Sequence, residues 1–240
     1  MFHLVRIGMP PIRFVYFDLD NTLLDHRYAE RAALGDVIDD FPALFTGCDM
    51  DAVHDTYHRI NKPLWQAYAQ GTIDKATVKQ QRFRRLLDAL GADTEQASVV
   101  HTRYLQRYGA HWRYVPGAQQ AFAQVAEQYG VGILTNGFSE TQQRKMNQFP
   151  ALRSACASVI ICEEVGHLKP HPAVFAHATE QACVEPGEIL YVGDSYTSDV
   201  KGSARAGWQI AWYTPRESPS KPVANGFSFS DWPDLLRRVL

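Results

Sequence analysis

The chain has 240 residues, of which 45% are apolar and 21% are charged. This is the balance of an ordinary globular protein that is long enough for one substantial core, or for a core with a modest second domain. The net charge of −2 gives no reason to expect a nucleic-acid or membrane partner, and no apolar run approaches the ~20 residues of a membrane-spanning helix.

The first residues, "MFHLVRIGMPPIRF", lack the uninterrupted apolar stretch and the small-residue cleavage site of a signal peptide. We therefore expect a cytoplasmic protein, with Met9 as an alternative start.

The apolar run "RFVYF" follows and predicts a short buried strand. It ends in "DLDNT", which places the carboxylates of Asp18 and Asp20 at the strand end. Aspartate and asparagine are ordinary turn residues, so this segment alone does not separate a turn from a catalytic site.

Residues 26–109 show a helical pattern. Apolar residues recur at helical spacing in three groups: Val53, Tyr57, Ile60, Leu64 and Tyr68; Phe83, Leu86, Leu87 and Leu90; Val100, Tyr104 and Tyr108. Asp49 and Asp93 are candidate N-caps, and Gly71 and Gly91 are candidate helix ends. Pro63 predicts a kink or break near Lys62.

After residue 117 the pattern changes to short apolar runs that alternate with helical stretches. The expected strands are 131–137, 157–162, 188–194 and 208–213, and the expected helices lie around 118–129, 139–147, 172–183 and 198–206. Residues 214–226 predict a surface loop. This alternation is typical of an α/β fold with a Rossmann-like parallel sheet flanked by helices. The first strand belongs to the same sheet, so we expect an α/β core of residues 1–25 and 110–240 with a helical insertion, 26–109.

Polar residues follow several of the expected strands. Thr135 and Asn136 end one strand, Asp194 ends another with Asp199 five residues on, and Lys169 lies shortly after a third. Each has an ordinary explanation as a turn or loop residue. Ligands of an open parallel sheet sit beyond the carboxyl ends of its strands, however, and here carboxylates and a lysine converge on that edge. The combination favours a functional site.

The set suits phosphoryl transfer. A carboxylate that attacks a phosphate dianion meets a repulsion of roughly 8 kcal/mol at ~4 Å and an effective dielectric of ~20. Magnesium would offset it, with Asp18 and Asp194 as carboxylate ligands and Asp199 holding a water or orienting the loop. Lys169 adds a positive charge where nucleophile and phosphoryl oxygens meet.

Other residues would complete such a site. The Thr135 hydroxyl and the amides around Asn136 and Gly137 can donate hydrogen bonds to phosphoryl oxygens. Asp20 lies two residues after Asp18, the period that keeps strand side chains on one face. It is then placed to protonate the leaving oxygen and later to activate water.

The segments "DLDNT", "LTNG", "LKP" and "GDSYTSD", in this order, resemble the four motifs of the haloacid dehalogenase-like hydrolase superfamily. The resemblance implies that Asp18 is a nucleophile that forms an aspartyl-phosphate and that Asp20 is the acid and base. It further implies phosphate binding by Thr135, Asn136 and Lys169. The Asp20 backbone carbonyl, Asp18 and Asp194 would surround magnesium. The insertion resembles the family's type 1 cap. An acid at Asp20 favours a phosphatase or phosphomutase over a dehalogenase, because a halide leaving group needs no proton.

A narrower resemblance covers "NKPLWQAYAQGTI", "LTNGF" and "EEVGHLKPHPAVF", which look like the pyrimidine 5'-nucleotidase branch. It implies a small phosphorylated substrate, in particular a nucleoside monophosphate. Residues of the insertion would then select the leaving group: Asn61, Lys62, Trp65 and Tyr68. The two aromatic residues have an alternative role as core of the insertion. His171 stands where relatives more often carry Asp or Asn.

Two further readings stay open. The enzyme could be a phosphatase or mutase for sugar phosphates or other small metabolites. A binding protein that kept the fold but lost activity is the third reading, although such a chain should have lost one of the core residues. The four cysteines form no CxxC pair and are expected to be buried free thiols: Cys48, Cys156, Cys162 and Cys183.

Overall fold

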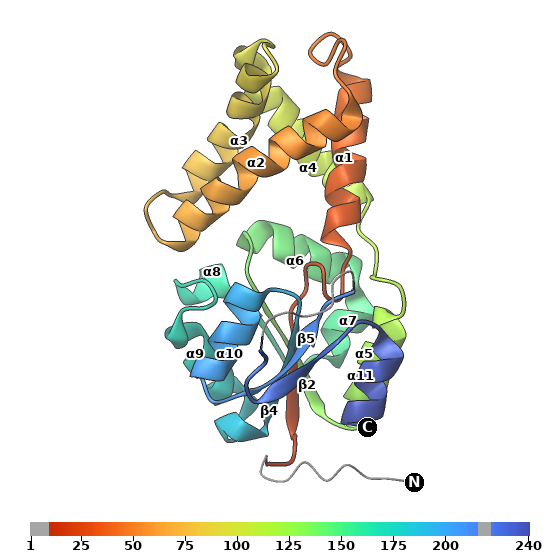
Figure 1. Ribbon diagram of the computed structural model, residues 1–240, viewed down its shortest axis with the longest axis vertical. Helices are drawn as coiled ribbons and strands as arrows, with labels where there is room; N and C mark the ends of the chain where they lie inside the picture. The colour runs from red at the N-terminus through yellow and green to blue at the C-terminus, as the bar shows by residue number, and fades with distance from the viewer. Residues whose placement is uncertain (1–9, 216–221) are drawn as a thin grey trace. The chain divides into compact units, whose positions relative to one another are not determined.

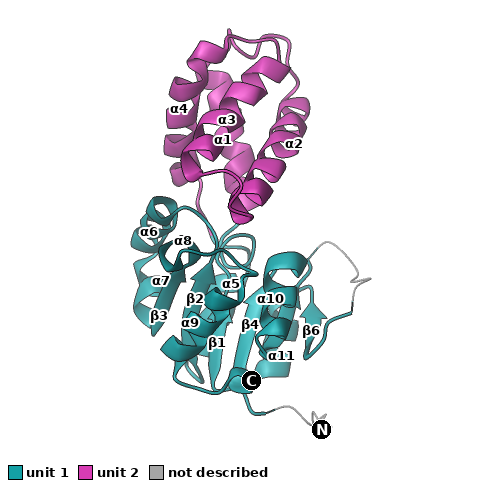
Figure 2. Ribbon diagram, turned by 90° about the vertical axis from the view of Figure 1, so that its left-hand side faces the viewer, with its two compact units in different colours: residues 1–25, 114–240 teal, residues 26–113 magenta. Residues whose placement is uncertain are grey.

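The computed structural model describes residues 10–215 and 222–240 (Figure 1). The candidate start at Met9 therefore lies outside the described residues. The chain divides into two compact units (Figure 2). Unit 1 comprises Met1–Asp25 and Tyr114–Leu240, and unit 2 comprises His26–Arg113. The assignment of separate domains from the sequence stays a prediction.

Unit 1 is built on one parallel sheet. Its strands are β1 (Phe14–Phe17), β2 (Gly130–Thr135), β3 (Ser158–Ile161), β4 (Ile189–Gly193), β5 (Gln209–Tyr213) and β6 (Gly226–Phe229). Their spatial order is β3-β2-β1-β4-β5-β6, and every neighbouring pair is parallel. The predicted α/β fold with a parallel sheet is confirmed. The chain places β2 and β3 on one side of β1 and then β4, β5 and β6 on the other side, so the strand order changes direction beside β1. Open parallel sheets bind their ligands at such a switch point.

The central strand β1 explains how the core is divided. All four of its residues are buried, and successive side chains point to opposite faces of the sheet. Val15 and Phe17 join one hydrophobic cluster, and Phe14 and Tyr16 join the other. A strand that is buried on both faces consists of consecutive apolar residues, as the sequence "FVYF" does.

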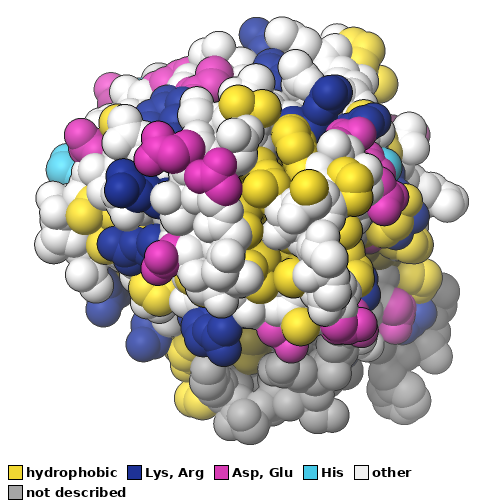
Figure 3. Space-filling view, turned by 90° about the horizontal axis from the view of Figure 1, so that it is seen from above, with side chains coloured by type: hydrophobic (Ala, Val, Ile, Leu, Met, Phe, Trp, Pro, Cys, Tyr) yellow, Lys and Arg dark blue, Asp and Glu magenta, His cyan; other side chains and the backbone are white. Residues whose placement is uncertain are grey.

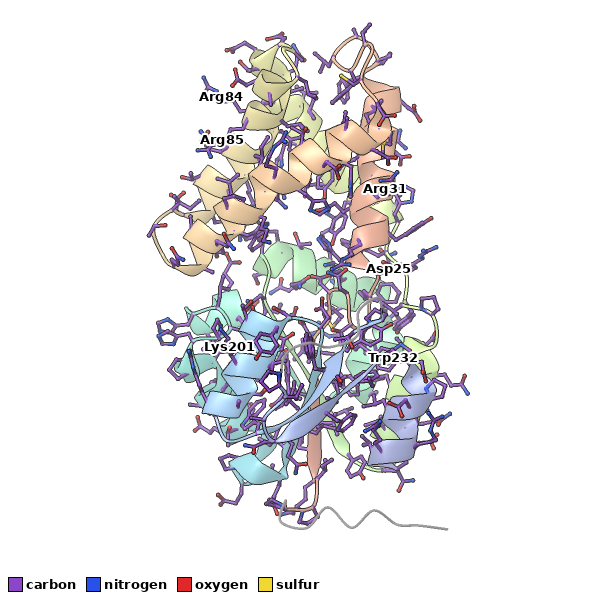
Figure 4. The ribbon with its side chains drawn as sticks, viewed as in Figure 1. Asp25, Arg31, Arg84, Arg85, Lys201 and Trp232 are labelled. Carbon is purple, nitrogen blue, oxygen red and sulfur yellow. The ribbon has the colours of Figure 1, made fainter. Side chains whose placement is uncertain are left out.

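Helices cover both faces of this sheet. The first cluster takes its side chains from α5 (Ala118–Ala126), α6 (Ser139–Gln148), α7 (Pro150–Ala155) and α11 (Trp232–Val239). Trp232, at the start of α11, is buried in it (Figure 4). The second cluster takes its side chains mainly from α8 (Cys162–Val165) and α9 (Pro172–Ala182), and α10 (Lys201–Arg205) packs beside α9. Two short turns of helix, η2 (Pro186–Glu188) and the π-helical η3 (Tyr196–Val200), flank β4.

Several segments differ from the sequence-based expectation. Strand β6 was not predicted, because four residues at the end of an expected loop give too short a pattern. Its alternation is nevertheless clear in the structure, where Phe227 and Phe229 are buried and their neighbours are not. Helices α7, α8 and α11 were also missed, and all three have eight residues or fewer.

Unit 2 is helical, as predicted. It contains α1 (His26–Asp40), α2 (Met50–Ala69), α3 (Lys75–Ala89), the 3₁₀ turn η1 (Thr94–Gln96) and α4 (Ala97–Ala110). Helix α1 packs on α4, and α2 packs on α3. Most residues at the predicted helical spacing form its core: Val53, Tyr57, Leu64, Phe83, Leu86, Leu87, Val100, Tyr104 and Tyr108.

The helix ends of unit 2 follow from local chemistry. The Asp49 side chain accepts hydrogen bonds from the backbone N–H groups of Asp51 and Ala52 and so caps α2, and Asp93 caps η1 in the same way. Gly71 and Gly91 follow α2 and α3 with φ near 69° and 68°. Glycine adopts this left-handed conformation without the steric cost of a Cβ atom. All four predicted end positions are confirmed.

Of the predicted kink or break near Lys62, the break was wrong, since α2 runs through Pro63 from Met50 to Ala69. The kink stays a prediction. Proline removes one backbone donor, so the carbonyl of Arg59, four residues earlier, loses its helical partner. Both residues are exposed, and water can satisfy that carbonyl at little cost.

The four cysteines are free, as predicted, but only Cys162 is buried and Cys183 is exposed. Cys183 is the C-cap of α9 and adopts the left-handed conformation. Among the described residues no helix is long and apolar enough to cross a membrane. On the face shown in Figure 3, acidic and basic side chains are interspersed rather than gathered by sign.

Candidate active site at the carboxyl edge of the sheet

The predicted core residues of the site lie together in unit 1. Asp18 follows β1, Thr135 ends β2 and Asp194 follows β4. These strands are parallel neighbours, so their carboxyl ends meet at one edge of the sheet. The backbone N–H of Asp18 donates to the carbonyl of Val192 over 2.8 Å, which extends the pairing of β1 and β4 to the site itself.

Lys169 stands at the centre of a buried polar network. Its ammonium lies 3.0 Å from Oδ1 of Asp18 and 2.9 Å from Oδ1 of Asp199. It also donates to the Tyr191 hydroxyl over 2.5 Å, and that hydroxyl donates to the carbonyl of Leu134 over 2.7 Å. The lysine is only 2% exposed. A buried ammonium needs such partners, because its charge is otherwise poorly solvated.

The charges of this network do not cancel. Burial raises the pKa of Asp18 to about 7; nearby Lys169 lowers it, and the Asp199 charge raises it further. The pKa of Lys169 lies above its usual value because Asp18 and Asp199 outweigh the effect of burial. Two carboxylates thus share one ammonium in a buried site, and a further positive charge would favour the ionised form of Asp18.

A hard cation fits the donor set. Asp18, Asp194 and Asp199 offer carboxylate oxygens that all lie within 4.8 Å of one another. Oxygen ligands of this kind suit Mg²⁺. Asp199 is already used: one of its oxygens bonds to Lys169, and the other accepts from the backbone N–H of Ser195 over 2.9 Å. Both oxygens of Asp199 are thus engaged within the protein.

The approach of Asp199 depends on Gly193. A Cβ atom on Gly193 would lie 2.4 Å from Oδ2 of Asp199, which is far inside van der Waals contact. The glycine of "GDSYTSD" therefore leaves room for the carboxylate that holds Lys169.

Asn136 connects the end of β2 to the lysine loop. Its side-chain N–H₂ donates to the carbonyl of Lys169 over 3.0 Å, and its side-chain oxygen accepts from the Lys169 N–H over 2.8 Å. This reciprocal pair holds the backbone of Lys169 in place. The Asn136 side chain is thereby engaged within the protein.

Asp20 occupies a second, separate polar cluster. Lys145 of α6 donates to its Oδ1 over 2.5 Å, and Gln142 of α6 donates to its Oδ2 over 3.0 Å. The same Gln142 amide lies 2.9 Å from Oγ1 of Thr135. Lys145 and Gln142 are almost completely buried. Helix α6 thus ties the second carboxylate of "DLDNT" to the end of β2.

Three of these residues were missed from the sequence: Gln142, Lys145 and Tyr191. Gln142 and Lys145 are three residues apart, so they lie on one face of α6. The signal was available in "SETQQRKMNQ", a helix so polar that some of its polar residues had to face the protein. Tyr191 was missed because it lies in the apolar run "EILYVGD", where a tyrosine is expected to be an ordinary residue of the hydrophobic core.

The residues expected to select the substrate belong to unit 2. Asn61, Lys62, Trp65 and Tyr68 all lie on α2. Asn61 is buried, and its side-chain oxygen has no hydrogen-bond partner within the described part of the chain. The rings of Trp65 and Tyr68 meet edge to face at 5.7 Å. The core residues therefore come together in unit 1, whereas these four form a separate group.

Comparisons with known proteins identify a family for this chain. The family model described as haloacid dehalogenase-like hydrolase matches residues 12–207. The hydrolase YfnB of Bacillus subtilis (strain 168) is 30% identical over 218 residues, covering 89% of each chain. Its crystal structure, bound to magnesium, aligns with a TM-score of 0.82 at 26% identity and covers 96% of this chain and 99% of that one.

Two further relatives carry names that specify a substrate. Pyrimidine 5'-nucleotidase YjjG of Escherichia coli (strain K12) is 29% identical, covering 86% of this chain and 88% of its own. N-acylneuraminate-9-phosphatase of Mus musculus is 25% identical and covers 97% of each chain. The chain is thus similar along most of its length to enzymes named for two different substrates.

Proposed function

Because the chain belongs to the haloacid dehalogenase-like hydrolases, we propose that it is a magnesium-dependent phosphomonoester hydrolase that works through an aspartyl-phosphate. The observation that carries the proposal is the separation of Asp18 from Asp20. Asp18 lies 3.0 Å from the ammonium of Lys169, whereas Asp20 is held by Lys145 and Gln142. Two carboxylates in different surroundings can take two different roles.

In the first step an oxygen of ionised Asp18 attacks the phosphorus atom. A bond forms between that oxygen and phosphorus, and the bond to the ester oxygen breaks. Asp20 delivers a proton to the departing oxygen, so that an alcohol leaves rather than an alkoxide. Lys169 and the backbone amides beside Asn136 offset the charge on the phosphoryl oxygens.

In the second step Asp20, now ionised, takes a proton from water. The water oxygen attacks phosphorus, the bond to Asp18 breaks, and inorganic phosphate is released with Asp18 restored. Both oxygens of Asp20 have a donor in the structure, so proton transfer requires one of these hydrogen bonds to be exchanged. Lys145 and Gln142 therefore set where the Asp20 carboxyl group points.

Magnesium would be held by Asp18 and Asp194, with the Asp20 carbonyl as a third oxygen and Asp199 acting through a water or through the loop. Bound there, the ion supplies positive charge to the phosphoryl oxygens and offsets their repulsion from the nucleophile. Two observations support this assignment: the carboxylate oxygens of Asp18, Asp194 and Asp199 lie within 4.8 Å of one another, and the pKa of Asp18 is raised.

For the substrate we propose a pyrimidine nucleoside monophosphate. The support is the segment "NKPLWQAYAQGTI" on and after α2 and the similarity to the E. coli nucleotidase. Asn61 adds to it, because a buried amide oxygen without a donor is costly and a ligand N–H would satisfy it. A sugar phosphate is the second candidate, which the similarity to N-acylneuraminate-9-phosphatase favours.

A substrate panel with Mg²⁺ tests both the proposed phosphatase activity and the proposed nucleotide substrate. The panel contains deoxyuridine and thymidine monophosphates, N-acylneuraminate 9-phosphate, glyceraldehyde 3-phosphate and p-nitrophenyl phosphate, with Asp18→Asn as the inactive control. We expect kcat/KM to be highest for the pyrimidine nucleotides. Higher values for a sugar phosphate would exclude the nucleotidase and keep the phosphatase. No phosphate release from any ester would exclude both.

A further inference from the structure

Unit 2 contains a buried carboxylate that is surrounded by imidazoles. Glu30 lies on α1 and is 1% exposed. His58 Nε2, on α2, lies 2.9 Å from Glu30 Oε1, and His26 Nε2 lies 3.5 Å from Glu30 Oε2. His54, one helical turn before His58, stacks edge to face on it with ring centroids 4.4 Å apart.

Two buried atoms of this cluster have no hydrogen bond of good geometry among the described residues. Although His58 is close, no hydrogen bond of acceptable geometry reaches Oε1 of Glu30 among the described residues. The buried Nε2 of His54 has none either within that part of the chain. Leaving a buried donor or acceptor unsatisfied is costly, and a ligand bound by this cluster would satisfy both atoms.

The structure assigns to this cluster a site for one divalent transition-metal ion of the Zn²⁺ class, bound by the side chains of Glu30, His54 and His58. Ligand atoms of all three side chains lie within 4.8 Å of one another. Bonds of about 2.0–2.2 Å to Zn²⁺ place tetrahedral ligand atoms roughly 3.3 Å apart, a change that small side-chain rotations supply. The site lies wholly within unit 2 and shares no residue with the candidate active site.

The type of ligand decides the type of metal. Two imidazoles and one carboxylate suit Zn²⁺, Ni²⁺ or Co²⁺, whereas Mg²⁺ prefers oxygen ligands alone. His54 and His58 are four residues apart, so α2 presents both rings on one face. Glu30 comes from another helix, and the ion would therefore cross-link α1 to α2, which contact each other in unit 2 (Figure 2).

The surroundings of the cluster support a metal site. His26 lies beside the second oxygen of Glu30, and its own Nδ1 shares a hydrogen bond of 2.7 Å with the Tyr108 hydroxyl. Hydrogen-bonded groups behind a ligand orient it toward the metal. The His58 side chain is 46% exposed, which gives an ion a path to the buried atoms.

Co²⁺ is the probe, because its visible absorption reports nitrogen and oxygen ligation. The whole protein is titrated with Co²⁺ in excess Mg²⁺, which occupies the all-oxygen site. We expect one Mg²⁺-resistant equivalent in the wild type and its loss in His54→Gln. Zn²⁺ should displace this Co²⁺ and raise the unfolding temperature of the wild type only.

Three controls isolate the site. Asp194→Asn, which alters the acidic cluster of unit 1, should keep the equivalent. His171→Gln should also keep it and so exclude the His167–His171 pair, whose rings stack at 3.8 Å in unit 1. His26→Gln should weaken binding by about 10- to 100-fold without abolishing it.

Folding of the variants is checked by metal-free thermal unfolding. If His54→Gln does not fold, the more exposed His58→Gln takes its place with the same expected loss. Equal Co²⁺ uptake by wild type and the histidine variant would overturn the assignment. So would a wild type that takes up no Co²⁺ once Mg²⁺ is present.

Discussion

The ammonium of Lys145 lies 2.5 Å from Oδ1 of Asp20, although 125 residues separate them in the chain. Lys145 is almost fully buried, and Asp20 keeps part of its surface exposed at the edge of the sheet. A buried lysine beside a partly exposed carboxylate serves to orient that carboxylate, because the lysine itself has no access to a substrate in solution.

Replacing Lys145 should therefore impair the acid step more than the nucleophilic one. In Lys145→Met we expect kcat to fall about 10- to 100-fold for an alkyl phosphate, whose leaving oxygen needs a proton. The loss should be much smaller for p-nitrophenyl phosphate, whose leaving group needs little protonation. Steady-state kinetics on both esters measure the difference. Equal losses on the two esters would show that Lys145 only stabilises the fold.

Asp18→Asn should abolish turnover and leave the fold intact. The substitution keeps the shape of the side chain and removes the nucleophilic charge, so we expect activity to fall by at least about 100-fold. Stability should hold or rise, because one charge leaves a cluster in which burial and Asp199 already raise the pKa of Asp18. Phosphate release and thermal unfolding are the two measurements. A variant that retained more than a few per cent of wild-type activity would remove Asp18 from its role.

Metal removal should silence the enzyme reversibly. Chelation should reduce phosphate release to background, and Mg²⁺ should restore it. Ca²⁺ should substitute poorly, because it prefers more ligands at longer distances and would displace Asp18 from phosphorus. The experiment is a chelator titration followed by addition of each ion. Undiminished activity in excess chelator would contradict the mechanism.

Residues of α2 should affect nucleotides selectively. We expect Asn61→Ala or Trp65→Ala to lower kcat/KM for deoxyuridine monophosphate by about 10-fold, with a much smaller effect on p-nitrophenyl phosphate. Arg59→Ala, an exposed change on the same helix, is the matched control and should alter neither. If both esters lose equally, these side chains maintain unit 2 rather than choose the substrate.

His101 should make the stability of unit 2 depend on pH. Burial, with help from the charges of Arg82 and Lys79, lowers its pKa to about 4. The unfolded chain binds this proton near pH 6.5 and the folded chain only near pH 4, so stability present above about pH 6.5 is lost as the pH falls toward 4.

Allowing for partial exposure, we expect His101 to contribute on the order of 1 to 2 kcal/mol of that loss. Urea unfolding of the wild type and His101→Gln at pH 7 and pH 4.5 measures it. The difference in unfolding free energy between the two pH values should be smaller in the variant. If the wild type and the variant showed the same difference, His101 would be protonated at pH 4.5 in the folded state as well as in the unfolded chain.

The sequence alone determined the framework of unit 1. Short apolar runs with polar ends are encoded locally, because strand burial and turn chemistry depend on adjacent residues. Asp18, Thr135, Lys169, Asp194 and Asp199 could therefore be found from their positions after such runs, and the structure brings them to one edge. Helical spacing likewise identified most of the core of unit 2.

Only the tertiary structure decided which side chains meet. A helix shows from its own sequence that it has a polar face, but not which strand end that face will meet. Gln142 and Lys145 reach Asp20, and Asn136 is bound to the backbone of Lys169, because the chain crossovers bring α6 and the lysine loop to the same sheet edge. In unit 2, Glu30 meets His54 and His58 for the same reason: the packing of α1 on α2 is a property of the whole fold, and no local pattern encodes it.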